Sequence, residues 1–142
     1  MGYPRPADEL ELLSRKQKGN PLDGVRCIAD RNGLAEIREV IDHTYINPKI
    51  LEYIIRLGNA TRSHAQILQG ASPRASLAAA SMAKAAAWVQ GRDYVIPADV
   101  KLIYPATITH RLLLTADAKA AGRSAEAILT EILKNTPAPT VK

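Results

Sequence analysis

The chain has 142 residues, enough for one domain with a hydrophobic core and too few for two domains of ordinary size. Apolar residues make up 46% of the chain, but aromatic residues only 4%, and phenylalanine is absent. A core built from leucine, isoleucine, valine and alanine favours packed helices over sheets. The single cysteine, Cys27, excludes an internal disulfide, and the three scattered histidines argue against a structural zinc site.

The formal net charge of +5 is compatible with an anionic partner. The basic residues are nevertheless spread along the chain, and their one cluster, Arg15-Lys16-Gln17-Lys18, falls in the last turn of a predicted helix, where the helix dipole favours cations. The charge therefore does not favour nucleic acid as a partner. No apolar run approaches the ~20 residues needed to span a membrane, and no signal peptide is visible. We therefore expect a cytoplasmic protein without a membrane span.

Helical spacing of apolar residues and capping residues predict an all-α protein, a small helical bundle with at most a minimal β pairing. The six predicted helical segments are about Pro6–Lys18, Gly33–His43, the cap Asn47-Pro48 to Arg62, Pro73–Gln90, a helix from Pro97 onward, and a helix after the cap Ser124. A single turn from Asn20-Pro21 to Val25 is expected after the first helix. Pro105 is expected to kink or divide the fifth, with Thr107–Leu113 as a separate turn.

Apolar faces indicate which side of each helix points into the core. The third helix has a broad apolar face of Ile50, Leu51, Ile54, Ile55 and Leu57. The fourth carries a stripe of Leu77, Ser81, Ala85 and Trp88, and its alanine-rich flanks allow close approach of neighbouring helices. The inward residues of the fifth are Val100 and Ile103, and the stripe of the last is Ile128, Leu129, Ile132 and Leu133. The piece Tyr94–Ile96 is β-prone and is expected to pair with Thr44–Ile46 or with an extended piece around Cys27-Ile28. The stretch Ser63–Gln69 is expected to be a loop.

The stretch Gly70-Ala71-Ser72-Pro73-Arg74 places an arginine in the first turn of the fourth helix. Gly70 allows a sharp turn, Ser72 is a good N-cap and Pro73 suits the first helical position. A cation there faces the positive end of the helix dipole, which costs roughly 0.3–1 kcal/mol unless an anion answers it. Two interpretations stay open: a phosphate site made by free N–H groups and the Arg74 guanidinium, or a solvated arginine beside an ordinary cap. The motif alone favours the second.

Other chemistry is not indicated by the residues. No phosphate-binding loop, dinucleotide-binding glycine motif, zinc-protease motif or paired-cysteine motif occurs. His43, His64 and His110 lie far apart, and none stands beside a nucleophile in a recognisable arrangement, so we interpret each as a surface or helix-end histidine. Nothing in the chain indicates a self-contained enzyme.

Taken in order, the motifs resemble the C-terminal lid of MoxR-type AAA+ ATPases (methanol dehydrogenase regulatory protein-like). The matching pieces, which span nearly the whole chain, are Gly2-Tyr3-Pro4, Asn20-Pro21-Leu22, Leu51–Ile55, Ala60-Thr61-Arg62, Gly70–Ala75, Gly91–Val100 and His110-Arg111-Leu112. The resemblance implies that residues 1–5 are the junction with a nucleotide-binding core domain and that residues 6–136 are the helical lid domain. The prolines of Pro137-Ala138-Pro139 predict a frayed tail over residues 137–142.

The resemblance also implies roles for particular residues. Arg74 falls on the sensor-2 arginine of the family, which reaches the γ-phosphate of ATP, and Ser72 stands beside it at the helix start. Tyr3, Pro4 and Ala71 are implied near the adenine side of the cleft. ATP and Mg²⁺ would be bound in the intact parent, whereas this chain alone is expected to bind neither tightly and to hydrolyse no ATP.

The implied partners are the chain's own AAA+ core domain, further subunits in a homo-oligomeric ring (a hexamer), and von Willebrand factor A-domain proteins. The implied role is that of a chaperone-like or regulatory ATPase. The alternative is a helical adaptor that binds proteins and has no nucleotide role.

Overall fold

The computed structural model describes residues 3–17 and 19–140, which contacts between residues divide into two compact units, Met1–Ala35 and Glu36–Lys142. Predictions made for Gly2, Lys18 and the last two residues of the tail lie outside the described residues. Among the residues described, no helix combines the length and the apolar character that crossing a membrane requires.

The first unit contains helix α1 (Pro6–Gln17) and a 3₁₀ turn, η1 (Pro21–Gly24). The Asn20 side chain caps η1 by accepting the N–H of Leu22, which confirms the predicted turn. None of the α1 residues is buried. The extended piece expected around Cys27-Ile28 forms no strand, although Val25 just before it has extended backbone angles. Cys27 is exposed, and its thiol lies 3.3 Å from the carbonyl oxygen of Ala29.

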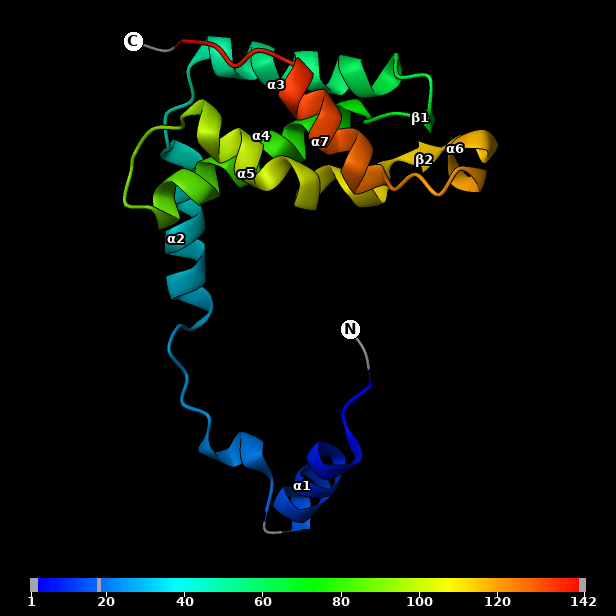
Figure 1. Ribbon diagram of the computed structural model, residues 1–142. Helices are drawn as coiled ribbons and strands as arrows, with labels where there is room; N and C mark the ends of the chain where they lie inside the picture. Colours follow the sequence, from blue (N-terminus) through cyan, green and yellow to red (C-terminus); the bar gives the residue numbers. More distant parts are fainter. Residues whose placement is uncertain (1–2, 18, 141–142) are drawn as a thin grey trace. The chain divides into compact units, whose positions relative to one another are not determined.

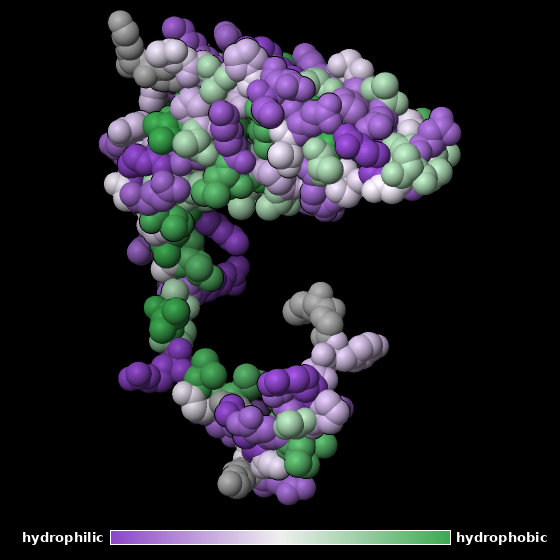
Figure 2. Space-filling view, in the orientation of Figure 1, coloured by the Kyte–Doolittle hydropathy of each residue, from purple (hydrophilic) through white to green (hydrophobic). Residues whose placement is uncertain are grey.

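Helix α2 (Arg31–His43) starts two residues earlier than predicted. Asp30 explains the earlier start, because its carboxylate accepts the N–H of Gly33 at 2.8 Å and so caps the helix. No α2 residue is buried. Leu34 and Val40 are about half exposed, and Figure 2 shows hydrophobic side chains gathered along this helix.

The second unit is a helical bundle with one short strand pair (Figure 1), which confirms the predicted fold class. It includes α2 from Glu36 onward, then α3 (Pro48–Arg62), α4 (Pro73–Val89), α5 (Pro97–Ile108), α6 (Ala116–Ala120) and α7 (Ala125–Asn135). A 3₁₀ turn, η2 (Thr109–Arg111), lies between α5 and the second strand. Asn47, Ser72 and Ser124 cap α3, α4 and α7 through their side chains, as predicted. The short helix α6, capped by Thr115, was not predicted.

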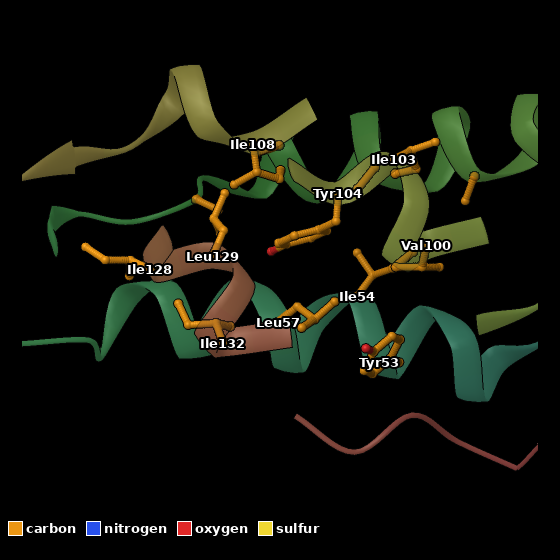
Figure 3. Packing of buried hydrophobic residues seen from close by; sticks show 14 of the residues in the cluster. Tyr53, Ile54, Leu57, Val100, Ile103, Tyr104, Ile108, Ile128, Leu129 and Ile132 are labelled. Atoms are coloured by element: carbon orange, nitrogen blue, oxygen red, sulfur yellow. The ribbon is translucent and has the colours of Figure 1, made fainter. Parts of the chain in front are cut away.

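The core lies where α3, α4, α5 and α7 meet, and Figure 3 shows its larger side chains from α3, α5 and α7. Its largest fully buried side chains are Tyr53, Tyr104, Ile50, Ile54, Leu57, Ile108, Ile128, Leu129 and Val100. The apolar face of α3 is narrower than predicted, because Leu51 and Ile55 are 38% and 54% exposed. The predicted inward side chains of α5 and α7 are confirmed, with Leu133 at the edge of the core.

Helix α4 buries a different face from the one predicted. Its buried residues are Ala75, Ala79, Ala83 and Ala87, spaced four apart and all fully enclosed. Leu77 of the predicted stripe is instead 70% exposed. Alanine leaves little side chain between two helices, so α4 and α5 can lie close together and the hydrophobicity of single residues is a poor guide to the packed face.

Residues 67–69 form a strand, β1 (Ile67–Gln69), rather than the expected loop. It pairs antiparallel with β2 (Leu113–Leu114), and Ile67 lies opposite Leu114. The partner is more than forty residues away in the sequence, so local composition gives no signal for it. The expected pairing of the Thr44 and Tyr94 pieces is confirmed as a single bridge between Tyr45 and Tyr94.

Gly91 ends a helix as predicted, whereas Pro105 does not divide one. Gly91, at a φ of 74°, ends α4 with a two-bond C-cap, in which the N–H groups of Gly91 and Arg92 donate to the carbonyls of Trp88 and Ala87. Pro105 does not divide α5, which runs on to Ile108. The separate turn expected over Thr107–Leu113 is shorter in the structure. It is η2 (Thr109–Arg111), because residues 107 and 108 still belong to α5 and Leu113 begins β2.

Candidate functional site

The candidate site is the start of α4. Ser72 has extended backbone angles and its hydroxyl accepts the N–H of Ala75 at 3.3 Å, while Pro73 takes the first helical position. Arg74 follows and is exposed. The four ion pairs of the described residues do not include Arg74, and no acidic residue lies in the first turn of α4. The guanidinium is therefore available to an external anion.

The segment before this helix is fastened to the end of α3. The N–H of Ala71 donates to the Thr61 hydroxyl at 2.9 Å, and the carbonyl oxygen of Ala71 accepts the Nε–H of Arg62 at 2.7 Å. Thr61 is fully buried, and its hydroxyl donates in turn to the carbonyl oxygen of Gly58 at 2.6 Å. Sequence reasoning gave Thr61 and Arg62 no role. The signals for these two residues were the match of Ala60-Thr61-Arg62 to the family pattern and their place in the last turn of a predicted helix.

Gly70 is needed for close approach. A Cβ atom on Gly70 would lie 2.7 Å from the backbone N and Cα of Arg62 and 2.8 Å from the carbonyl carbon of Thr61. Backbone atoms at such distances have no room for a side chain. The lack of a side chain at Gly70 therefore lets the loop backbone pack directly against the backbone of α3.

The structure describes the other residues predicted near adenine, Ala71, Tyr3 and Pro4, each within its own unit. Ala71 is only 1% exposed, and both its backbone polar groups are engaged within the chain. Tyr3 and Pro4 belong to the first compact unit and are exposed. The places of Ala71, Tyr3 and Pro4 beside adenine stay predictions.

An apolar groove borders the site. It runs between α3 and α4 with a volume of about 480 Å³, and its lining includes Ile55, Leu77, Arg62 and Pro73. Arg62 thus lies between the apolar groove and the loop that it holds. Its other contact, from a terminal nitrogen to the side-chain oxygen of Asn59 at 3.0 Å, keeps the guanidinium against α3.

A second arginine, Arg92, has a different place. It donates two hydrogen bonds to the buried carboxylate of Asp99, and the bond to this carboxylate raises the pKa of Arg92 above its ordinary value. The partner is internal, so Arg92 contributes to the connection between α4 and α5. Among residues 3–17 and 19–140, no group of three or more histidine, cysteine or acidic side chains could hold a metal ion.

The fold matches a known class of domain. The family of the AAA lid domain matches residues 59–132, more than half of the chain and the whole stretch from the end of α3 to α7. The chain therefore belongs to the AAA lid domain family and is a lid module of the MoxR type.

Its relatives are longer proteins. It is 34% identical over 139 residues to the uncharacterized protein YeaC of Bacillus subtilis, covering 98% of this chain and 43% of YeaC. It is also 34% identical over 150 residues to the chaperone MoxR1 of Mycobacterium tuberculosis, covering 99% of this chain and 39% of MoxR1. The crystal structure of a putative ATPase from Cytophaga hutchinsonii superposes with a TM-score of 0.83 at 32% identity, covering 99% of this chain and 45% of that one. The chain thus spans less than half the length of these relatives.

Proposed function

We propose that this chain acts as the C-terminal lid of a MoxR-type AAA+ ATPase and that Arg74 is its sensor-2 arginine. The observation that carries the proposal is the exposed Arg74 in the first turn of α4, without an ion-pair partner among the described residues. A cation at this end of a helix is unfavourable unless an anion faces it. Pro73 has no N–H, and Ser72 already accepts that of Ala75. A phosphate group satisfies both the guanidinium and the N–H of Arg74, so these residues fit ATP.

The role of Arg74 is positioning and charge stabilisation. A planar guanidinium engages two phosphate oxygens at once and offsets the negative charge that develops during phosphoryl transfer. Ser72 holds the helix start in place through its bond to Ala75. Because the contact depends on the γ-phosphate, its loss after hydrolysis would free the lid to move against the core. ATP supplies the phosphoryl group in the intact protein.

The rest of the proposal concerns the longer protein. Its core domain would provide the phosphate-binding loop and the ligands of Mg²⁺, and the isolated lid would hydrolyse no ATP. We further propose the domain limits 6–136 for the lid, with a junction at 1–5 and a tail at 137–142. We also propose that the longer protein forms a hexameric ring, lies in the cytoplasm and has a chaperone-like or regulatory role. Its proposed partners are von Willebrand factor A-domain proteins.

The test is Arg74→Ala in the longer protein, with steady-state ATP turnover and a melting curve measured on the same sample. Arg74 is exposed, so truncation should change the free energy of unfolding by no more than about 0.5 kcal/mol. Turnover should fall roughly 10³-fold, as for other arginines that contact the transferring phosphoryl group. Arg74→Lys should restore only part of the turnover, because an ammonium group cannot bind two phosphate oxygens in the bidentate geometry of a guanidinium.

The chain offers a matched control in Lys49. It too is an exposed cation in the first turn of a helix that begins with a side-chain cap and a proline, Asn47-Pro48. Lys49→Ala should leave turnover unchanged. If Arg74→Ala also leaves turnover unchanged, Arg74 is a solvated cap residue, and the adaptor without a nucleotide role becomes the better account.

A further inference from the structure

The loop that carries the predicted sensor is fastened to α3 through the backbone of one residue, Ala71. Both polar backbone groups of Ala71 are bound by consecutive residues, Thr61 and Arg62. The preceding residue, Gly70, touches the backbone of the same two residues. We propose that Thr61 and Arg62 are positioning residues, which hold the segment Gly70–Ser72 on the end of α3 and so fix where Arg74 stands.

The Thr61 hydroxyl can hold the loop because it acts as a hydrogen-bond donor and acceptor at the same time. It donates to the carbonyl oxygen of Gly58 within α3, which directs its lone pairs toward the N–H of Ala71. Thr61 and Ala71 are buried, with 0% and 1% of their surfaces exposed, so water cannot replace the bond. A valine of the same shape would leave the Ala71 N–H without a partner.

Arg62 holds the other side of the same peptide. Its Nε–H meets the carbonyl oxygen of Ala71 at 2.7 Å, a length expected for a bond strengthened by charge. A second bond from the guanidinium to Asn59 restricts the side chain to this orientation. Unlike Thr61, Arg62 is exposed, so replacing it removes the contact without opening the core.

The consequence is mechanical coupling between α3 and the start of α4. Ser72, Pro73 and Arg74 follow Ala71 directly, so a shift of the Ala71 peptide moves the helix start and the guanidinium with it. This inference rests on the proposed function for its catalytic consequence, but the positioning itself is a property of this chain. Misplacing a charge-stabilising group by about 1 Å can cost up to 10²-fold in rate.

The first experiment measures amide hydrogen exchange on this chain. In Thr61→Val the Ala71 amide should exchange about tenfold faster or more, whereas the Leu129 amide in α7 should keep its rate. Thr61→Ser should restore protection at Ala71. The matched control is Thr107→Val, which removes another buried hydroxyl that donates to a helical carbonyl, that of Ile103, and should leave Ala71 unchanged. Unchanged exchange at Ala71 in Thr61→Val would overturn the positioning role.

The second experiment measures turnover in the longer ATPase. Thr61→Val and Arg62→Met should each lower kcat about 10- to 100-fold with a smaller change in KM, and Thr61→Ser should restore kcat. Arg111→Met is the control for Arg62, because Arg111 also ends a helical segment and donates through Nε to a backbone carbonyl, that of Thr107, and it should leave kcat unchanged. Should Thr61→Val fail to fold, Arg62→Met decides the question.

The outcomes separate the two proposals. If Arg74→Ala leaves turnover unchanged while Ala71 exchanges faster in Thr61→Val, the sensor role fails and the fastening of the loop stands. If Arg74→Ala abolishes turnover but Thr61→Val and Arg62→Met leave kcat unchanged, the sensor role stands and the positioning role in catalysis is overturned.

Discussion

Arg92 and Asp99 form a two-bonded ion pair that ties the end of α4 to the start of α5. Terminal nitrogens of Arg92 meet the two carboxylate oxygens of Asp99 at 2.5 and 2.8 Å. The Asp99 side chain is 1% exposed and also accepts the N–H of Ile96 at 2.8 Å, which caps α5. One buried carboxylate thus closes the turn between the two most closely packed helices.

We predict that Asp99→Ala lowers the free energy of unfolding by about 2–3 kcal/mol, because the variant loses both the ion pair and the helix cap. Arg92→Met should also lower the melting temperature, since it leaves a buried carboxylate with fewer partners. Urea unfolding checks both. Glu131→Ala is the control: it breaks the exposed pair with Arg123 and should cost less than about 0.5 kcal/mol. Equal costs for Asp99→Ala and Glu131→Ala would contradict the prediction.

Gly70→Ala should destabilise the second unit by about 1–3 kcal/mol, because the new Cβ atom would overlap the backbone of Thr61 and Arg62. The measurement is thermal unfolding followed by circular dichroism. Gln69→Ala, at the exposed neighbouring position, should be close to neutral. A Gly70→Ala variant as stable as the parent would show that the loop can leave α3 freely.

Tyr53→Phe should keep or raise stability, by up to about 1 kcal/mol, which is unusual for a buried residue. The Tyr53 hydroxyl is buried and has no hydrogen-bond partner among the described residues, so its removal relieves a desolvated polar group and leaves the ring in place. Tyr45→Phe, at an exposed tyrosine, should change nothing. Chemical denaturation of the three proteins side by side checks this, and a loss of more than about 1 kcal/mol in Tyr53→Phe would reveal a partner for the hydroxyl.

Alkaline pH should destabilise the fold through its two buried tyrosines. Burial raises the pKa of Tyr53 and of Tyr104, although nearby arginines, Arg56 and Arg62, oppose the shift. Above about pH 10 the unfolded chain loses these protons while the folded chain keeps them, so the folded state binds more protons and stability falls as pH rises. The slope is up to about 1.4 kcal/mol per pH unit for each tyrosine. Urea unfolding at several pH values should show a flatter dependence in Tyr104→Phe, and an unchanged slope would contradict this.

Much of the fold follows from local chemistry that is legible in the sequence. Asn47, Ser72 and Ser124 were predicted as caps because a side-chain oxygen followed by a helical pattern satisfies early N–H groups without help from the rest of the chain. Gly91 was predicted as a helix end because only glycine adopts positive φ at little cost. The position of Arg74 in a helical first turn was equally local, and its exposure agrees with the sequence.

Packing between distant segments was not predictable in the same way. The strand pair Ile67–Leu114 depends on two segments meeting across the bundle, and the buried face of α4 depends on how closely α5 approaches its alanines. The sequence predicted that Gly70 allows a sharp turn, whereas the structure shows that it allows close backbone contact with Thr61 and Arg62. Only the folded chain brings these residues together. The sequence by itself determined the longer helices, the caps Asn47, Ser72 and Ser124, and the candidate arginine, since these depend on neighbours a few residues apart. The tertiary structure alone decided which faces are buried and what fastens that arginine's helix, since these depend on contacts between segments that no local pattern encodes.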